Sequence, residues 1–255
     1  MIFVRTPRSP LTVAAQFALV ACSLVLGTGK AQAIPLTDLF AGGPGSTIAV
    51  GDAVFSDWML IANDAETDLS QIEVTALAGA GGDPGLLFVD TGGVLVAEMS
   101  DDFFELTEPP SDFFDITFQY TVTSPSRQLD EAALELVDFT IAGTGALTID
   151  ETVETGDQSN ALADLSVFAF GIPDPVETQL LDVQSFAPQE IFVVTTNLFA
   201  VAGGPGDRAE LTQFGQRFAG AAVPEPASLG LLLAGLAGLG VMSRSSRKAR
   251  DGRVS

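Results

Sequence analysis

Apolar and polar residues alternate along most of the chain between residues 46 and 218, which is the pattern of half-buried β-strands. In the clearest run, Phe114, Ile116, Phe118, Tyr120 and Val122 alternate with polar residues. Further runs of strand-forming residues cover 46–50, 53–61, 71–78, 86–90, 93–98, 133–141, 146–155, 163–170, 178–183, 190–201 and 210–218. Turn-forming glycine and proline segments separate these runs. The pattern predicts an all-β body of about ten to twelve short antiparallel strands.

Three segments depart from this simple alternation. Within 133–141 the apolar phase switches after Leu136, which predicts either a bulge or a strand that is buried on both faces. Residues 130–136 carry a weak helical pattern, the only one in the body. Residues 100–112 are rich in acidic side chains and contain Pro109 and Pro110, so we expect a loop there.

The body has enough aromatic bulk to fill the space between two packed sheets. Of the 18 phenylalanines, 16 lie within residues 34–222. No internal repeat or linker divides this segment, and a domain of this size needs no disulfide. We therefore expect one domain at 34–222, an antiparallel β-sandwich resembling a jelly roll.

Charge and composition narrow the function classes. The chain has a formal net charge of −22, no histidine and one cysteine. Residues 34–222 hold 31 acidic residues against three arginines and no lysine, so this segment alone carries −28. Such a surface repels phosphates, which argues against nucleic acid as a partner. The lack of histidine and the single cysteine argue against most zinc sites and against histidine-dependent catalysis.

Residues 1–33 have the features of a secretory signal peptide. Arg5 and Arg8 precede a mostly apolar stretch over 11–26, and Ala31 and Ala33 are the small residues expected before a cleavage site. We expect signal peptidase and the export machinery as partners, and a mature chain that starts at Ile34. A rival interpretation uses residues 19–22 as a lipoprotein box that ends in a lipidated cysteine, although the apolar stretch continues beyond it.

The C-terminal segment has three consecutive parts. Residues 223–228 read Val-Pro-Glu-Pro-Ala-Ser, and the prolines favour an extended backbone. Residues 229–242 are rich in leucine, glycine and alanine, which predicts a single short transmembrane helix; the uncharged run 227–242 would span roughly 24 Å as a helix. Residues 243–250 follow with four cations that would keep this end in the cytoplasm: Arg244, Arg247, Lys248 and Arg250.

This arrangement resembles the PEP-CTERM sorting signal of Gram-negative bacteria over residues 223–250. The resemblance implies that an exosortase, a membrane cysteine protease-transpeptidase, recognises Pro224, Glu225 and Pro226. It also implies that the protein is cut near the motif and delivered to the cell surface or to an exopolysaccharide matrix. In that relationship the chain is the substrate of the exosortase, held in the membrane through 229–242 at least transiently.

Two patterns suggest catalysis, but each has a simpler structural interpretation. Residues 90–92 read Asp-Thr-Gly, which resembles the active-site motif of aspartic proteases. Such a site needs two carboxylates, from a second motif, which the chain lacks, or from a homodimer. We interpret these residues and Gly93 as a turn between strands. The 31 acidic residues make some carboxylate pair inevitable, so a pair alone is no evidence for a glycosidase. We expect that the protein is not an enzyme.

Calcium or another hard cation fits this composition, because carboxylates are the ligands that such ions prefer. The candidate ligands are Asp64, Glu66, Asp68, Asp101 and Asp102. The group at 64–68 lacks the glycine and the bidentate glutamate of an EF-hand, and a solvated acidic loop is the simpler interpretation of both groups. We expect no cofactor, with calcium as the alternative.

The leading hypothesis is an exported surface or matrix protein with a non-enzymatic structural or adhesive body, sorted through its tail. The alternative is a module that binds calcium or carbohydrate, with exopolysaccharide as a candidate partner. A hydrolase that uses carboxylates is the third hypothesis.

Overall fold

The computed structural model describes residues 32–42, 46–79, 82–99, 112–171 and 177–220. All of them belong to one compact unit, which ends at Gly220. Within these ranges no helix is long and apolar enough to cross a membrane. The predicted signal peptide up to Ala31, the loop residues 100–111 and the helix predicted at 229–242 lie outside the described residues.

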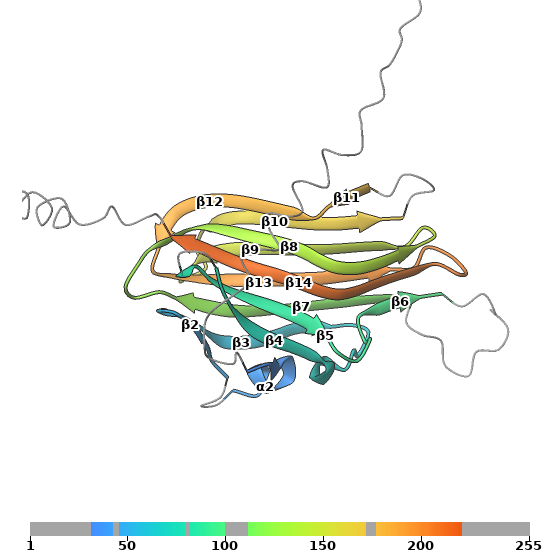
Figure 1. Cartoon of the computed structure of the whole chain (residues 1–255), viewed down its shortest axis with the longest axis horizontal. Helices are drawn as coiled ribbons and strands as arrows, with labels where there is room; N and C mark the ends of the chain where they lie inside the picture. Colours follow the sequence, from blue (N-terminus) through green and yellow to red (C-terminus); the bar gives the residue numbers. More distant parts are fainter. Residues whose placement is uncertain (1–31, 43–45, 80–81, 100–111, 172–176, 221–255) are drawn as a thin grey trace, which may run out of the picture. The chain divides into compact units, whose positions relative to one another are not determined.

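The described strands form two antiparallel sheets, drawn as stacked layers in Figure 1. Sheet A has the order β1 (Ile34–Pro35), β4 (Ile72–Ala78), β5 (Pro84–Asp90), β14 (Arg208–Gly220), β8 (Leu129–Ala142) and β12 (Leu181–Gln189), with β6 (Val96–Glu98) also paired to β14. Sheet B has the order β11 (Glu177–Gln179), β10 (Ala161–Phe170), β9 (Ala146–Thr155), β13 (Ile191–Val201), β7 (Phe113–Thr123), β3 (Ala53–Asn63) and β2 (Ile48–Val50). The predicted all-β fold with antiparallel sheets is confirmed.

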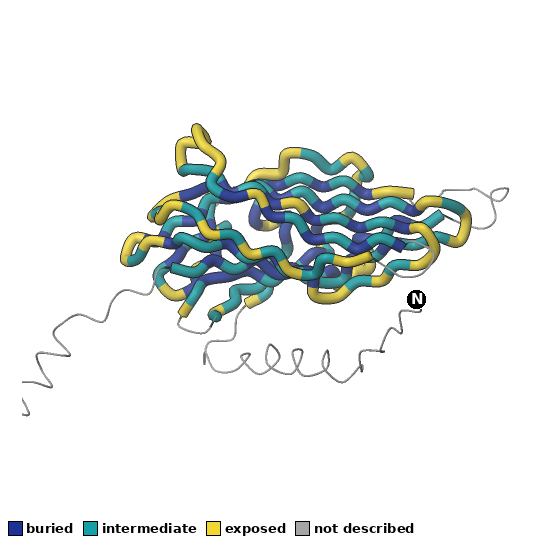
Figure 2. Tube along the Cα trace, turned by 90° about the horizontal axis from the view of Figure 1, so that it is seen from above, coloured by how far each residue is buried: buried dark blue, intermediate teal, exposed yellow. Residues whose placement is uncertain are grey.

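The hydrophobic core is one contiguous cluster to which both sheets contribute. Along β7 the burial alternates as predicted, and Phe114, Phe118 and Tyr120 are at most 1% exposed. Figure 2 shows this alternation of buried and partly exposed residues along the strands. Aromatic rings join the layers: Phe88 of sheet A lies 5.5 Å, between ring centroids, from Phe118 of sheet B. Such contacts add to the burial energy that holds the sheets together.

Short helices at one side of the sheets were not predicted. The helix α2 (Leu36–Phe40) has only five residues, too few for an amphipathic pattern to stand out. Its Leu36 and Leu39 side chains are fully buried in the core. The 3₁₀-helix η1 (Leu69–Gln71) begins after Asp68, whose carboxylate accepts a hydrogen bond from the Ser70 backbone N–H.

Strand β8 explains both the weak helical pattern at 130–136 and the phase switch after Leu136. The weak helical pattern at 130–136 was misleading, because these residues are strand paired on both sides, to β14 and β12. The phase switch is a bulge: Leu136 pairs with Phe214 and Asp138 pairs with Gln213, while Val137 between them has no partner and is 45% exposed.

Side chains of β12 cover a free strand edge in the other sheet. Beyond residues 168–170, strand β10 has no backbone partner on the side away from β9 within the described part of the chain. There the Ser166 backbone N–H donates to the Asp182 carboxylate at 3.0 Å, and the Gln184 side-chain amide donates to the carbonyl oxygen of Asp164. Two side chains of sheet A thus satisfy backbone groups of sheet B.

Candidate functional site

A cluster of four polar side chains lies buried between the two sheets. Tyr120, Glu151 and Thr196 project from β7, β9 and β13 of sheet B, and Gln216 projects from β14 of sheet A. All four are at most 1% exposed. We call them the inter-sheet cluster. Because buried polar groups cost free energy unless they are paired, such a cluster is a candidate for a specific role.

The Gln216 side chain is the centre of this cluster. The Tyr120 hydroxyl donates to its amide oxygen Oε1 at 2.6 Å. Its amide nitrogen Nε2 donates to the Thr196 hydroxyl oxygen at 2.8 Å and to Glu151 Oε2 at 2.5 Å. Every polar atom of the Gln216 side chain is therefore engaged with a group from the opposite sheet.

The electrostatics of the cluster follow from its burial. Removal from water raises the pKa of Glu151 to about 8, against a smaller lowering by the hydrogen bond from Gln216. At neutral pH this carboxyl group therefore holds its proton. Burial, with a smaller contribution from the nearby Glu151, also raises the pKa of Tyr120 well above its ordinary value, so its hydroxyl stays a donor. The second oxygen of Glu151, Oε1, has no hydrogen-bond partner among the described residues.

The strand pattern explains how these side chains reach the core. Glu151 lies in the same phase as Leu147, Ile149 and Val153 of β9, all of which are buried. Thr196 and Gln216 likewise share the phase of buried apolar neighbours, such as Leu198 and Phe218. The sequence interpretation noted the core phase of Tyr120 but missed the other three. A polar residue on the apolar phase of a strand was the signal that could have found them.

The Asp-Thr-Gly segment is a turn, as predicted. One oxygen of Asp90 accepts the backbone N–H groups of Gly92 and Gly93, at 3.0 and 2.8 Å, and the other accepts that of Leu95 at 2.7 Å. Asp90 is 9% exposed, and both oxygens of its carboxylate accept hydrogen bonds that hold the loop after β5 in place. Its role here is to satisfy backbone donors.

The acidic residues between β3 and η1 do not gather into a metal site. Asp64 and Glu66 form the turn after β3, with Glu66 in the left-handed conformation. The Ser70 hydroxyl and backbone N–H donate to Asp68, and these hydrogen bonds lower its pKa. Among the described residues no three potential metal-ligating side chains come together. Asp101 and Asp102 lie outside the described residues, and the calcium hypothesis stays a prediction.

An open hollow of about 410 Å³ lies between the loop after β3 and the strands β6 and β14. Its polar lining comes from Thr67, Asp68, Glu98 and Arg208. The Arg208 guanidinium contacts Glu98 at 2.8 Å, so the charges within the hollow partly neutralise each other. The hollow has room for a small polar ligand, and the carbohydrate alternative also stays a prediction.

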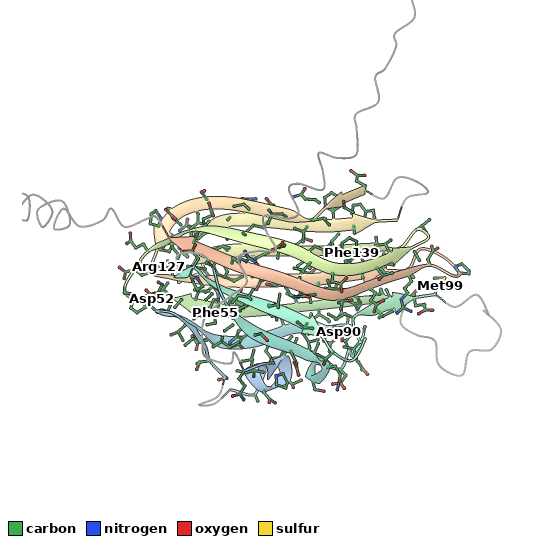
Figure 3. All side chains as sticks on the ribbon, viewed as in Figure 1. Asp52, Phe55, Asp90, Met99, Arg127 and Phe139 are labelled. Atoms are coloured by element: carbon green, nitrogen blue, oxygen red, sulfur yellow. The ribbon has the colours of Figure 1, made fainter. Side chains whose placement is uncertain are left out.

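All three arginines of the described residues are engaged by acidic side chains. The Arg127 guanidinium joins three loops at one end of the strands, where Figure 3 shows it beside Asp52. The Ser126 hydroxyl also donates to Asp52, and this bond is the main cause of that carboxyl group's lowered pKa. The ion pairs are Arg127 with Asp52 and Asp83, Arg208 with Glu98 and Glu210, and Arg217 with Glu135. The remaining acidic side chains leave the surface anionic.

The tail matches a known family. The family described as the PEP-CTERM protein-sorting motif matches residues 222–248. The chain carries a PEP-CTERM sorting motif. This finding confirms the resemblance seen in the sequence, and a PEP-CTERM motif marks an exported protein that an exosortase sorts. Of the residues assigned to sorting and cleavage, Ala33 is described and lies directly before β1. The others lie outside the described residues: Ala31, Pro224, Glu225, Pro226, Arg244, Arg247, Lys248 and Arg250.

Comparisons of the whole chain add less than the motif. No curated protein matches it. Similar solved structures include TmCBM61 in complex with β-1,4-galactotriose, with 11% identity over 63% of this chain and 88% of that one and a TM-score of 0.28. Another is the KRT10-binding region domain of the pneumococcal serine-rich repeat protein PsrP, with 10% identity over 61% and 89% and a TM-score of 0.29. Likeness at these scores assigns no ligand to this chain.

Proposed function

We propose that the protein is an exported surface or matrix protein, whose two-sheet body is a structural or adhesive β-sandwich and whose PEP-CTERM tail directs its delivery. The match to the sorting motif at residues 222–248 is the observation that carries this proposal. In it, Pro224, Glu225 and Pro226 are the residues that the exosortase recognises. The segment 229–242 holds the tail in the membrane until processing, and the cations that follow stay in the cytoplasm.

The construction of the body supports a structural role. Its core is continuous from sheet to sheet, and side chains of β12 cover the free edge of β10. The excess of acidic over basic residues keeps such a surface hydrated and limits self-association before delivery. An anionic, well-packed module of this kind suits a hydrated exopolysaccharide matrix.

The proposal is tested by changing the motif in the full-length protein. We expect that replacing Pro224, Glu225 and Pro226 together by alanine leaves export intact but abolishes delivery to the surface, so that the protein accumulates in the membrane fraction. The matched control is Ser185→Ala on the exposed strand β12, which should reach the surface normally. Immunodetection in surface, membrane and medium fractions gives the readout. Unchanged delivery of the triple variant would refute exosortase sorting.

A further inference from the structure

The inter-sheet cluster brings an alcohol and a primary amide together in a closed, apolar interior. The Thr196 hydroxyl and the Gln216 side-chain amide come from different sheets and are hydrogen-bonded to each other, and both residues are 0% exposed. We propose that Thr196 and Gln216 react to form an intramolecular ester bond, which crosslinks the two sheets and releases ammonia. The proposal rests on the cluster alone and does not depend on the proposed function.

The reacting groups are already in contact. Thr196 Oγ1 lies 2.8 Å from Gln216 Nε2, and the carbon to be attacked, Cδ, is bonded directly to that nitrogen. A short movement of the Thr196 side chain therefore brings Oγ1 from the nitrogen to the carbon. Two groups held in this way react as one molecule, which replaces the unfavourable encounter of separate reactants.

The neighbours are placed to assist the reaction. The Tyr120 hydroxyl already donates to the Gln216 carbonyl oxygen at 2.6 Å, where negative charge develops during attack. Glu151 contacts the leaving nitrogen through Oε2. It is also the cross-strand partner of Thr196 in the β9–β13 ladder, so the two side chains share one face of the sheet. Because burial keeps the Glu151 carboxyl protonated at neutral pH, it has a proton to give.

The atoms and electrons of the step balance without a co-reactant. A lone pair of Thr196 Oγ1 forms a bond to Gln216 Cδ, and the carbonyl electrons move to Oε1, which the Tyr120 hydroxyl stabilises. Glu151 gives its proton to the nitrogen and takes the proton of the Thr196 hydroxyl. The carbonyl bond re-forms, the bond between Cδ and nitrogen breaks, and ammonia leaves. Glu151 ends in its original state, and the products are one ester and one ammonia.

The position of the ester would allow it to resist a pulling force on the tail. Strand β14 is the last of the described strands and ends at Gly220, shortly before the sorting motif in the sequence. A pull on the tail acts first on β14, which is held in sheet A by hydrogen bonds to β5, β6 and β8. An ester to Thr196 would tie this strand to the centre of sheet B, where β13 pairs with both β7 and β9. Burial also protects the ester from hydrolysis by water.

The distribution of arginines allows a direct test by mass spectrometry. Residues 34–222 contain no lysine, and trypsin cuts this segment only after Arg127, Arg208 and Arg217. Thr196 therefore lies in peptide 128–208 and Gln216 in peptide 209–217. In the denatured and digested full-length protein, we expect the two peptides as one linked species, lighter than their sum by about 17 Da, the mass of one ammonia. Alkaline hydroxylamine should split it.

Linkage of the two peptides, and not the mass loss alone, is the decisive readout. Gln128 becomes the first residue of its peptide and can lose ammonia by cyclisation without any crosslink. A wild-type digest in which 209–217 occurs only as a free peptide with an intact Gln216 amide would overturn the proposal. This result is independent of whether any variant folds.

Variants assign the roles. Thr196→Val removes the attacking hydroxyl and should abolish the linked species. Glu151→Gln removes the proton carrier and Tyr120→Phe removes the donor to Oε1, and each should lower the linked fraction at least tenfold during a timed expression. The matched control is Thr195→Val, because the Thr195 hydroxyl points to Gln119 and away from the cluster. Equal linkage in all these variants would contradict the mechanism.

Discussion

Glu151 occupies a position in β9 where the alternation calls for an apolar side chain, and it remains there as a neutral acid. Its partner Gln216 comes from the other sheet, so the cluster links the two layers by hydrogen bonds. A carboxyl group in this place makes folding stability depend on pH. The direction follows from the raised pKa of Glu151, about 8 in the folded protein against an ordinary value of 4.5.

Between these two pH values the folded protein holds a proton that the unfolded chain has released. The free energy of unfolding therefore falls as the pH rises from about 4.5 to about 8, and it levels off above this window. We test this in the Thr196→Val background, which cannot form the ester. Adding Glu151→Gln should remove the slope and raise the free energy of unfolding at pH 9 by a few kcal/mol, with little change at pH 4.

The measurement is urea unfolding of the two full-length variants across this pH range. Parallel pH profiles would show that Glu151 is not a buried neutral acid in the folded protein. Because both variants carry Thr196→Val, the loss of the Thr196 hydroxyl affects them equally, and the difference between their profiles reports Glu151 alone.

At the scale of single elements, the sequence predicted the strands better than their partners. The alternation in 114–122 and the phase switch near Val137 are local signals, and both correspond to features of the structure. The helix α2 has too few residues to show a helical pattern. The segment 130–136 has a weak helical pattern, but it is a strand because β12 and β14 pair with it, and the sequence does not show these distant partners. Strand order depends on contacts between distant residues, such as Tyr120 and Gln216, which are 96 positions apart.

The edge of β10 is covered by side chains of β12, and their contribution can be measured. Replacing Asp182 and Gln184 together by alanine leaves the Ser166 N–H and the Asp164 carbonyl without partners. We expect hydrogen exchange in the peptide that contains Ser166 to become at least about tenfold faster. Ser185→Ala on the same strand is the control and should leave exchange unchanged. Unaltered protection in the double variant would mean that these side chains do not close the edge.

For the whole molecule, the two ends and the body contribute different information. The sorting motif of the tail is contiguous in the sequence, which is why it could be recognised from the sequence alone. The body carries its most specific feature in side chains from four strands, which only the fold brings together. Because Glu151, Thr196 and Gln216 are polar residues on apolar phases, a search for such exceptions would have named them but not their contacts.

We propose that the protein is exported and is processed at its PEP-CTERM tail. Mass spectrometry of the intact protein and of its terminal peptides, taken from the native surface fraction, tests it most directly. We predict an N-terminus at Ile34 and a C-terminus near Pro224–Pro226, with any additional mass at that end reporting a transferred group. A chain that extends to Ser255 would contradict exosortase processing, and a chain that starts at a lipidated Cys22 would contradict the predicted signal peptide.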